Sequence, residues 1–136
     1  WKGATLVEDC YNCSPDSLRA AALTLAAHPA KGRRILVLSD MLELGEQSAK
    51  MHAECGAFVA RQGIDMLMAC GEQSAFTIAG ANTAGMERCL YYPSKQQMTE
   101  TLRKAIRPGD VVWLKASRGM ALEEVSRALI EGGEDA

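Results

Sequence analysis

The sequence lacks a strong excess of charge of either sign. Its 136 residues carry 15 Lys and Arg against 17 Asp and Glu, which gives a formal net charge of −2. A module that binds DNA or RNA needs a basic field to meet the phosphate backbone. The composition therefore argues against nucleic acid as a partner.

Long apolar runs are also missing. No stretch approaches the roughly 18 apolar residues of a membrane-spanning helix, and no basic segment followed by an apolar one predicts a signal peptide. The five cysteines are an odd number, which indicates free thiols in a reducing compartment. We therefore expect a cytoplasmic protein with no membrane span. Trp1, only a few residues before the first predicted strand, indicates a fragment of a longer chain.

The two common phosphate-cradling motifs are absent as well. Neither G-x-x-x-x-G-K-[ST] nor G-x-G-x-x-G occurs in the sequence. The chain by itself therefore lacks a standard device for holding the phosphates of ATP. If it takes part in ATP chemistry, another domain must supply that loop.

What is present is a regular alternation of apolar runs with amphipathic segments. This alternation predicts one domain over residues 1–136, of α/β class, with a Rossmann-like three-layer αβα architecture. We expect a mostly parallel sheet of five or six strands flanked by helices on both faces. The predicted strands lie near residues 5–7, 35–38, 66–69, 89–91 and 111–114, and the predicted helices near 14–25, 47–62, 73–81, 94–105 and 121–130.

Local signals mark several helix ends. Ser14 followed by Pro15 predicts an N-cap with proline at the first helical position. Ser94 and Gln97 have the spacing of a capping box. Gly63 is a candidate for the residue that ends the second helix.

Ligands of open α/β sheets bind beyond the carboxyl ends of the strands. Asp9 and Asp40 follow the first two strands, where each carboxylate could accept hydrogen bonds from sugar hydroxyls or help hold a metal. Each could equally cap the backbone of its own loop. Lys115 and Arg118 follow the fifth strand and could bind a phosphate or carboxylate, although a solvated surface pair is the simpler interpretation.

Cysteine and histidine give weaker signals. Cys10 and Cys13 form a lone C-x-x-C, which fits a redox dithiol or half a zinc site, but two buried or loop thiols are the favoured interpretation. For His52 we favour a place on the polar face of its helix over metal binding, and for His28 a surface cation at a helix end. We predict no metal site in this chain.

Three segments in register resemble those of a known family. Residues 8–17 resemble the motif D-D-x-Y-N-A-N-P-x-S, residues 37–45 resemble V-L-G-D-M-x-E-L-G, and residues 115–120 resemble K-G-S-R-x-M. Residues 51–56 are similar to a family helix. These motifs are those of the C-terminal domain of the Mur ligases, in the branch that adds D-alanyl-D-alanine. The sequence departs from these motifs at Glu8, Cys13 and Ser14, and it has Ser39 and Ala116 where the family usually has glycine.

The resemblance implies a ligation in peptidoglycan biosynthesis. ATP phosphorylates the carboxylate of UDP-N-acetylmuramoyl-tripeptide, and the amine of D-alanyl-D-alanine attacks the acyl phosphate to give an amide, ADP and phosphate. Mg²⁺ and the phosphate-binding lysine belong to a central domain, and the UDP-sugar to an N-terminal domain, both absent here. The C-terminal domain closes over the nucleotide and brings in the dipeptide. Alone it is expected to be inactive, with no catalytic residue of its own, and monomeric.

The resemblance also assigns roles to individual residues. Asp9 matches the family position that contacts the ribose of the nucleotide. Ser117 and Arg118 match the family loop near the incoming dipeptide. Charge complementarity makes Arg118 the candidate for the free carboxylate of the dipeptide. The nucleotide set is Asp9, Tyr11 and Asn12, and the substrate set is Asp40, Lys115, Ser117 and Arg118.

Three alternatives remain open at this point. A sibling Mur ligase that adds another amino acid is the nearest. A phospho-receiver signalling domain would also have an acidic pair such as Glu8 and Asp9 and a lysine such as Lys115, but its phosphorylated Asp would follow the third strand, where Cys70 and Gly71 stand. A thioredoxin-like oxidoreductase would rest on the C-x-x-C alone.

Overall fold

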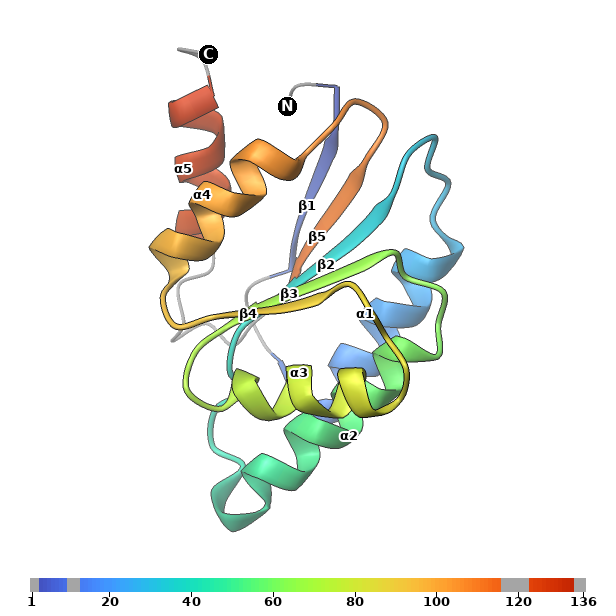
Figure 1. The fold of residues 1–136 in the computed structure, drawn as a ribbon, viewed down its shortest axis with the longest axis vertical. Helices are drawn as coiled ribbons and strands as arrows, with labels where there is room; N and C mark the ends of the chain where they lie inside the picture. The colour runs from blue at the N-terminus through green and yellow to red at the C-terminus, as the bar shows by residue number, and fades with distance from the viewer. Residues whose placement is uncertain (1–2, 10–12, 116–122, 134–136) are drawn as a thin grey trace.

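The computed structural model describes residues 3–9, 13–115 and 123–133, which form a sheet between two layers of helices (Figure 1). All strand pairs in these ranges are parallel, in the order β1-β5-β2-β3-β4. The α/β, Rossmann-like prediction is confirmed. The strands are β1 (Thr5–Asp9), β2 (Arg34–Leu38), β3 (Met66–Cys70), β4 (Cys89–Tyr92) and β5 (Val111–Lys115).

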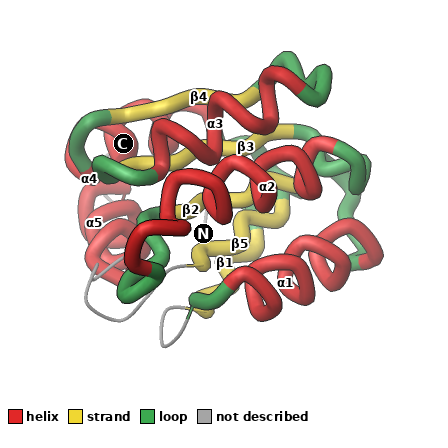
Figure 2. Tube along the Cα trace, turned by 90° about the horizontal axis from the view of Figure 1, so that it is seen from below, coloured by secondary structure: helices red, strands yellow, loops and turns green. Residues whose placement is uncertain are grey.

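The helices divide between the two faces of the sheet. The first three cover one face and the last two the other, as Figures 1 and 2 both show. A short 3-10 turn, η1 (Gly45–Gln47), precedes the second helix. The helices are α1 (Pro15–Ala27), α2 (Ser48–Ala60), α3 (Ser74–Thr83), α4 (Lys95–Ala105) and α5 (Glu123–Gly133).

Alternation along the central strands builds two apolar layers. In β2, Ile35 and Val37 join the layer under α4 and α5, whereas Leu36 and Leu38 join the layer under α1 and α2. All four side chains are buried, because β2 has strands on both sides and helices on both faces. The wholly apolar run in the sequence is explained by this central place.

The predicted helix ends are largely confirmed. Ser14 Oγ accepts the Ser17 N–H at 3.1 Å, and Ser17 Oγ accepts the Ser14 N–H at 2.8 Å, so this cap is reciprocal. Ser94 Oγ accepts the Gln97 N–H at 3.2 Å. The prediction for Gly63 is wrong in position, because α2 ends at Ala60 with Arg61 as its C-cap. Gly63 lies in the turn that follows, with a φ of 76°, in the left-handed region where glycine is favoured.

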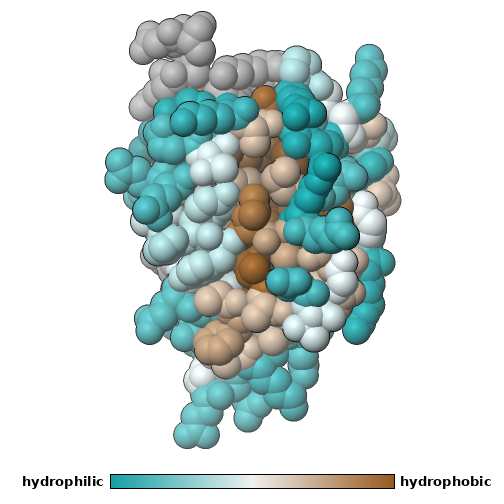
Figure 3. Space-filling model, viewed as in Figure 1, coloured by the Kyte–Doolittle hydropathy of each residue, from teal (hydrophilic) through white to brown (hydrophobic). Residues whose placement is uncertain are grey.

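Figure 3 shows an apolar strip down the middle of one face of the molecule, with hydrophilic surface on both sides. Among the described residues, the exposed large apolar side chains include Phe76 on α3 and Leu90 on β4, the strand at one edge of the sheet. Within residues 3–9, 13–115 and 123–133, none of the helices combines the length and apolar character needed to cross a bilayer.

Candidate functional site

The topology of the sheet selects one place for a ligand. Strand β5 lies between β1 and β2 in the sheet. The helices that follow β1 and β2, α1 and α2, cover one face of the sheet, whereas α5, which follows β5, covers the other face. Connections that diverge from neighbouring strands in this way leave a crevice at the carboxyl ends, where ligands of open α/β sheets bind. Lys115, at the end of β5, is the register partner of both Asp9 on β1 and Leu38 on β2. The candidate site is therefore centred on these strand ends.

Asp9 and Lys115 form an ion pair at this edge. Lys115 Nζ lies 3.0 Å from Asp9 Oδ1, and Trp113 Nε1 donates a hydrogen bond of 3.3 Å to Asp9 Oδ2. The three residues occupy alternate positions of paired strands and so lie on one face of the sheet. The Lys115 side chain is 5% exposed and that of Asp9 is 34% exposed. Asp9 therefore keeps surface on which its carboxylate can accept further hydrogen bonds.

This burial corrects one interpretation. Lys115 is not part of a solvated surface pair, because its ammonium is enclosed and neutralised by Asp9. One of its three N–H donors is thereby used, and its contact with a substrate stays a prediction. The other predicted residues beside these strand ends, Tyr11, Asn12, Ser117 and Arg118, lie outside the described residues, as do Cys10 and Ala116.

Asp40 is held by the N-terminus of α3. Its Oδ1 accepts hydrogen bonds from the Ser74 N–H at 2.7 Å and the Ser74 hydroxyl at 2.8 Å, while its Oδ2 accepts the Gln73 N–H at 3.1 Å. A carboxylate is favoured here by the helix dipole and by the unpaired N–H groups of the first turn. Asp40 thus caps backbone N–H groups, which is one of the two predicted roles. These groups belong to the start of α3 and not to the loop of Asp40 itself. Its substrate contact stays a prediction.

Gly71 makes room for this cap, and Ser39 joins the two strands beside it. Gly71 has a φ of 113°, and a Cβ there would lie 2.5 Å from Asp40 Oδ1, so a larger side chain would displace the carboxylate. Ser39, which replaces a family glycine, is not among the described residues with a positive φ. Its hydroxyl instead donates a 3.0 Å hydrogen bond to the carbonyl of Cys70 and ties β2 to β3.

His52 is a residue that the sequence interpretation misplaced. The prediction of a polar-face position is wrong, because the side chain is 1% exposed. It shares the buried face of α2 with Cys55, Gly56 and Val59. The i, i+3, i+4, i+7 spacing of these residues is the signal that would have found it. The imidazole Nε2 accepts the backbone N–H of Met41 at 2.9 Å, directly beside Asp40.

The thiols of Cys13, Cys55 and Cys70 do not fit redox chemistry. Burial raises the pKa of Cys13 to about 12, and the nearby Lys115 only partly opposes this rise. Burial likewise raises the pKa of Cys55 and of Cys70. A redox dithiol needs a thiolate near neutral pH, so Cys13 fits the favoured prediction of an inert buried thiol. No cluster of three metal-binding side chains occurs in the described part of the chain.

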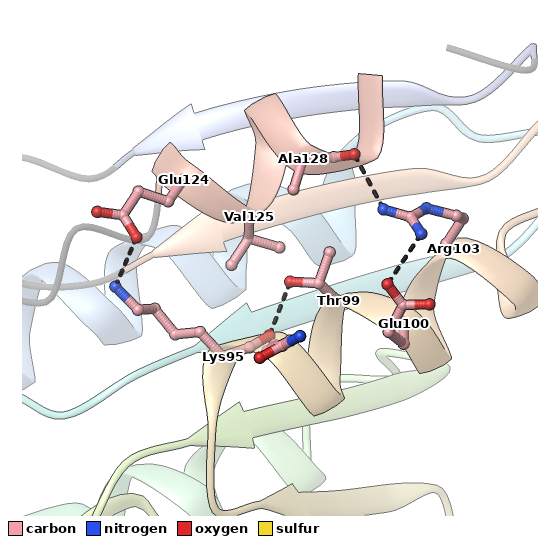
Figure 4. A pocket seen from close by; sticks show the side chains of 8 residues that line it. Lys95, Thr99, Glu100, Arg103, Glu124, Val125 and Ala128 are labelled. Atoms are coloured by element: carbon pink, nitrogen blue, oxygen red, sulfur yellow. Dashed lines mark hydrogen bonds and ion pairs between the residues drawn. The ribbon is translucent and has the colours of Figure 1, made fainter. Parts of the chain in front are cut away.

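A hollow of about 390 Å³ lies between α4 and α5, on the face of the sheet opposite α1 (Figure 4). Its charges are paired within the chain: Lys95 Nζ lies 3.0 Å from Glu124 Oε2, and Arg103 contacts Glu100 at 2.9 Å. None of the binding residues that the sequence predicts lines this hollow. The hollow is therefore a groove between two helices that are joined by the Lys95–Glu124 ion pair and by the hydrogen bond from Arg103 to the Ala128 carbonyl oxygen.

Comparisons with known proteins show the family of the chain. Residues 1–118 match the family described as Mur ligase, glutamate ligase domain. The UDP-N-acetylmuramoyl-tripeptide--D-alanyl-D-alanine ligase of Bacillus subtilis (strain 168) is 37% identical over 95% of this chain, which covers 28% of that protein. The enzyme of the same name from Escherichia coli (strain K12) is 36% identical over 94% of this chain, which covers 27% of it.

Solved structures give the same result. MurF ligase from Thermotoga maritima, in complex with ADP, superposes with a TM-score of 0.80 and 26% identity, over 98% of this chain and 30% of that one. MurF from Acinetobacter baumannii superposes with a TM-score of 0.86 over 96% of this chain and 29% of that one; at 24% identity it shows the likeness of fold. The chain spans less than a third of each of these relatives. It belongs to the Mur ligase family, as a glutamate ligase domain.

Proposed function

We propose that this chain is the C-terminal domain of a three-domain UDP-N-acetylmuramoyl-tripeptide--D-alanyl-D-alanine ligase. The observation that carries the proposal is the match to enzymes of that name over 95% and 94% of the chain. In the proposed reaction the tripeptide carboxylate takes the γ-phosphoryl group of ATP and releases ADP. The dipeptide amine then attacks the acyl carbon, phosphate leaves, and an amide forms.

The nucleotide side of the proposed site is built on Asp9. The partly exposed carboxylate of Asp9 can accept hydrogen bonds from ribose hydroxyls, while its contacts with Lys115 and Trp113 fix the orientation of the carboxylate. The relative from Thermotoga maritima was solved in complex with ADP, which supports the use of ATP by the parent enzyme. Tyr11 and Asn12, which follow β1 in the sequence, are proposed to complete the nucleotide contacts.

Mg²⁺ is proposed to be held elsewhere in the parent protein. A magnesium ion prefers carboxylate and water oxygens. The Asp9 carboxylate already accepts Lys115 and Trp113, and the Asp40 carboxylate already accepts three donors from α3. These two carboxylates thus do not fit a resident metal, and the ion that neutralises the transferring phosphate is assigned to the central domain.

The dipeptide side of the site is proposed to be formed by residues that follow Lys115 in the sequence. Arg118 would bind the free carboxylate of D-alanyl-D-alanine through a bidentate guanidinium pair, with Ser117 beside it. Arg118→Ala is then expected to raise the apparent KM for the dipeptide, and Arg118→Lys to restore it only in part, because lysine cannot bind in a fork. An unchanged KM in Arg118→Ala would remove this assignment.

The domain is proposed to act by closing over substrates that the other domains hold. Contacts from one domain alone bind nucleotide and dipeptide weakly, so the isolated chain is expected to be inactive. Five cysteines, of which Cys13, Cys55, Cys70 and Cys89 are free thiols, fit a reducing cytoplasm. We propose a cytoplasmic, monomeric parent enzyme.

The deciding experiment measures phosphate release from ATP by the full-length parent protein. UDP-N-acetylmuramoyl-tripeptide is supplied with D-alanyl-D-alanine, with single amino acids, or with neither. Release that needs both the tripeptide and the dipeptide, and that collapses in Asp9→Ala, supports the proposal. Release with a single amino acid would identify a sibling ligase instead. No release with any acceptor would overturn the proposed activity.

A further inference from the structure

A closed ring of hydrogen bonds joins α2 to the loops that follow β2 and β3. The Met41 N–H donates to His52 Nε2 at 2.9 Å, and His52 Nδ1 lies 2.7 Å from the Ser48 carbonyl oxygen. Ser48 Oγ donates to Gln73 Oε1 at 3.0 Å. The Gln73 N–H donates to Asp40 Oδ2 at 3.1 Å, and Asp40 is joined to Met41 by the peptide bond. Every member of the ring thus touches the next.

The ring fixes the tautomer of His52. A backbone N–H can only donate, so Nε2 must be the unprotonated nitrogen that accepts from Met41. The ring proton is therefore on Nδ1, where the Ser48 carbonyl accepts it. Met41 is itself buried, and its N–H would be left without an acceptor if the imidazole were removed. His52 therefore acts as the single support of this backbone donor from α2.

The loop that the ring holds is strained and points outward at its tip. Glu43 has a φ of 63°, and it is the non-glycine residue with positive φ among residues 3–9, 13–115 and 123–133. Its side chain and that of Leu42 are exposed. A left-handed conformation at a residue with a Cβ persists when its surroundings hold it in place. The buried base of the loop, Asp40 and Met41, supplies that hold.

We infer that His52 is a positioning residue for the proposed ligase, which keeps the loop of residues 39–44 in the shape that receives the incoming dipeptide. This loop leaves β2 directly beside Lys115, at the edge where the proposed site lies. His52 touches no substrate in this assignment. It acts through the Met41 backbone and the Asp40 cap. The inference rests on the proposed function for its kinetic consequence, and on the hydrogen-bond ring alone for its structural one.

The test compares two amide replacements in the full-length protein. His52→Gln places a carbonyl oxygen near Nε2 and can still accept the Met41 N–H. His52→Asn places its amide near Nδ1, so it can satisfy Ser48 but leaves Met41 without an acceptor. The matched control is His28→Asn, because His28 is the other histidine of the chain and caps the far end of α1.

Dipeptide-dependent phosphate release gives the first readout. His52→Asn is expected to raise the KM for D-alanyl-D-alanine about tenfold, from one buried donor left unpaired. The KM for ATP should stay within about twofold, since Asp9 and its partners are not in the ring. His52→Gln should recover most of the dipeptide affinity, and His28→Asn should match the wild type. Equal damage in His52→Gln and His52→Asn, or wild-type kinetics in His52→Asn, would overturn the inference.

Hydrogen–deuterium exchange separates this inference from the proposed activity. The amide of Met41 should be protected in the wild type and in His52→Gln, and should exchange at least about tenfold faster in His52→Asn. This readout needs no substrate, so it stands even if the wild type shows no ligase activity. Activity with an unprotected Met41 amide in the wild type would contradict the ring while leaving the proposed function intact.

Discussion

Asp9 and Lys115 are register partners at the ends of β1 and β5, and their side-chain charges lie 3.0 Å apart with very different access to water. The ammonium is enclosed, whereas a third of the Asp9 side chain is exposed. Removal of Asp9 therefore leaves an unpaired, enclosed ammonium, whereas removal of Lys115 leaves an unpaired, partly exposed carboxylate. An enclosed cation without a partner is costly, while a partly exposed carboxylate can turn to water.

The first prediction follows from this asymmetry. Asp9→Ala should lower the free energy of unfolding by about 2 kcal/mol, below the range for a fully buried pair because Asp9 is partly exposed. Lys115→Met should lower it by less than about 1 kcal/mol, since methionine fills similar space without a charge. Urea denaturation of both single variants and the double variant measures the coupling. Equal losses in the two single variants would contradict the asymmetry.

The second prediction concerns acid stability. Burial by itself would raise the pKa of Asp110, but hydrogen bonds from the Arg33 side chain and from the Arg33 and Arg107 backbone N–H groups lower it below its ordinary 3.8. The folded state therefore binds a proton later than the unfolded state as pH falls, and the stabilisation by Asp110 is complete above about pH 4. It should disappear as pH falls from there through the lower folded pKa.

Asp110→Asn tests this relation. The variant should be less stable than the wild type by about 3 kcal/mol at pH 7, because the Asp110 side chain is 2% exposed and paired with Arg33 at 2.8 Å. The difference should narrow at pH 3, where the wild type is losing the same contribution. Urea midpoints at the two pH values give the answer. The control is Asp16→Asn, whose side chain is fully exposed, so that its urea midpoint at pH 7 should stay close to that of the wild type.

The third prediction concerns the thiols. With a pKa of about 12, Cys13 has almost no thiolate at pH 8, and it is also buried. Iodoacetamide reacts with the thiolate, so native Cys13 should stay unmodified while the same residue reacts readily in urea. Peptide mass spectrometry measures the alkylation of each cysteine, and the half-buried Cys89 serves as the internal comparison for the buried Cys13. Rapid alkylation of Cys13 in the native protein would revive the dithiol alternative.

The contrast between predicted and unpredicted features has a physical cause. Ser14, Ser94 and the alternation of buried strands act over a few residues, so the sequence predicts them directly. The cap of α3 by Asp40 joins residues 33 and 34 positions apart, and it depends on the order of the strands. The spacing of His52 with Cys55, Gly56 and Val59 could have indicated its buried position. Its acceptor role, in contrast, becomes visible only when α2 packs beside Met41.

The site shows the same division. The rule that ligands bind at the carboxyl ends of strands predicts from the sequence that Asp9 and Lys115 lie at one edge of the sheet. Their mutual pairing was not predicted, because it requires β5 to insert between β1 and β2. The strand order is a property of the complete sheet, and short-range patterns carry no information about it.

The last prediction tests the packing of α2 on α3. Alanine in place of a mid-helix glycine normally stabilises a helix by about 1 kcal/mol. At Gly56, however, a Cβ would fall on the Thr77 carbonyl oxygen, and at Gly80 it would fall on that of Ala53. Gly56→Ala should therefore destabilise the chain by at least about 2 kcal/mol, whereas Lys50→Ala, exposed on the same helix, should stay within about 0.5 kcal/mol. A stabilised Gly56→Ala would mean that the two helices can separate without loss.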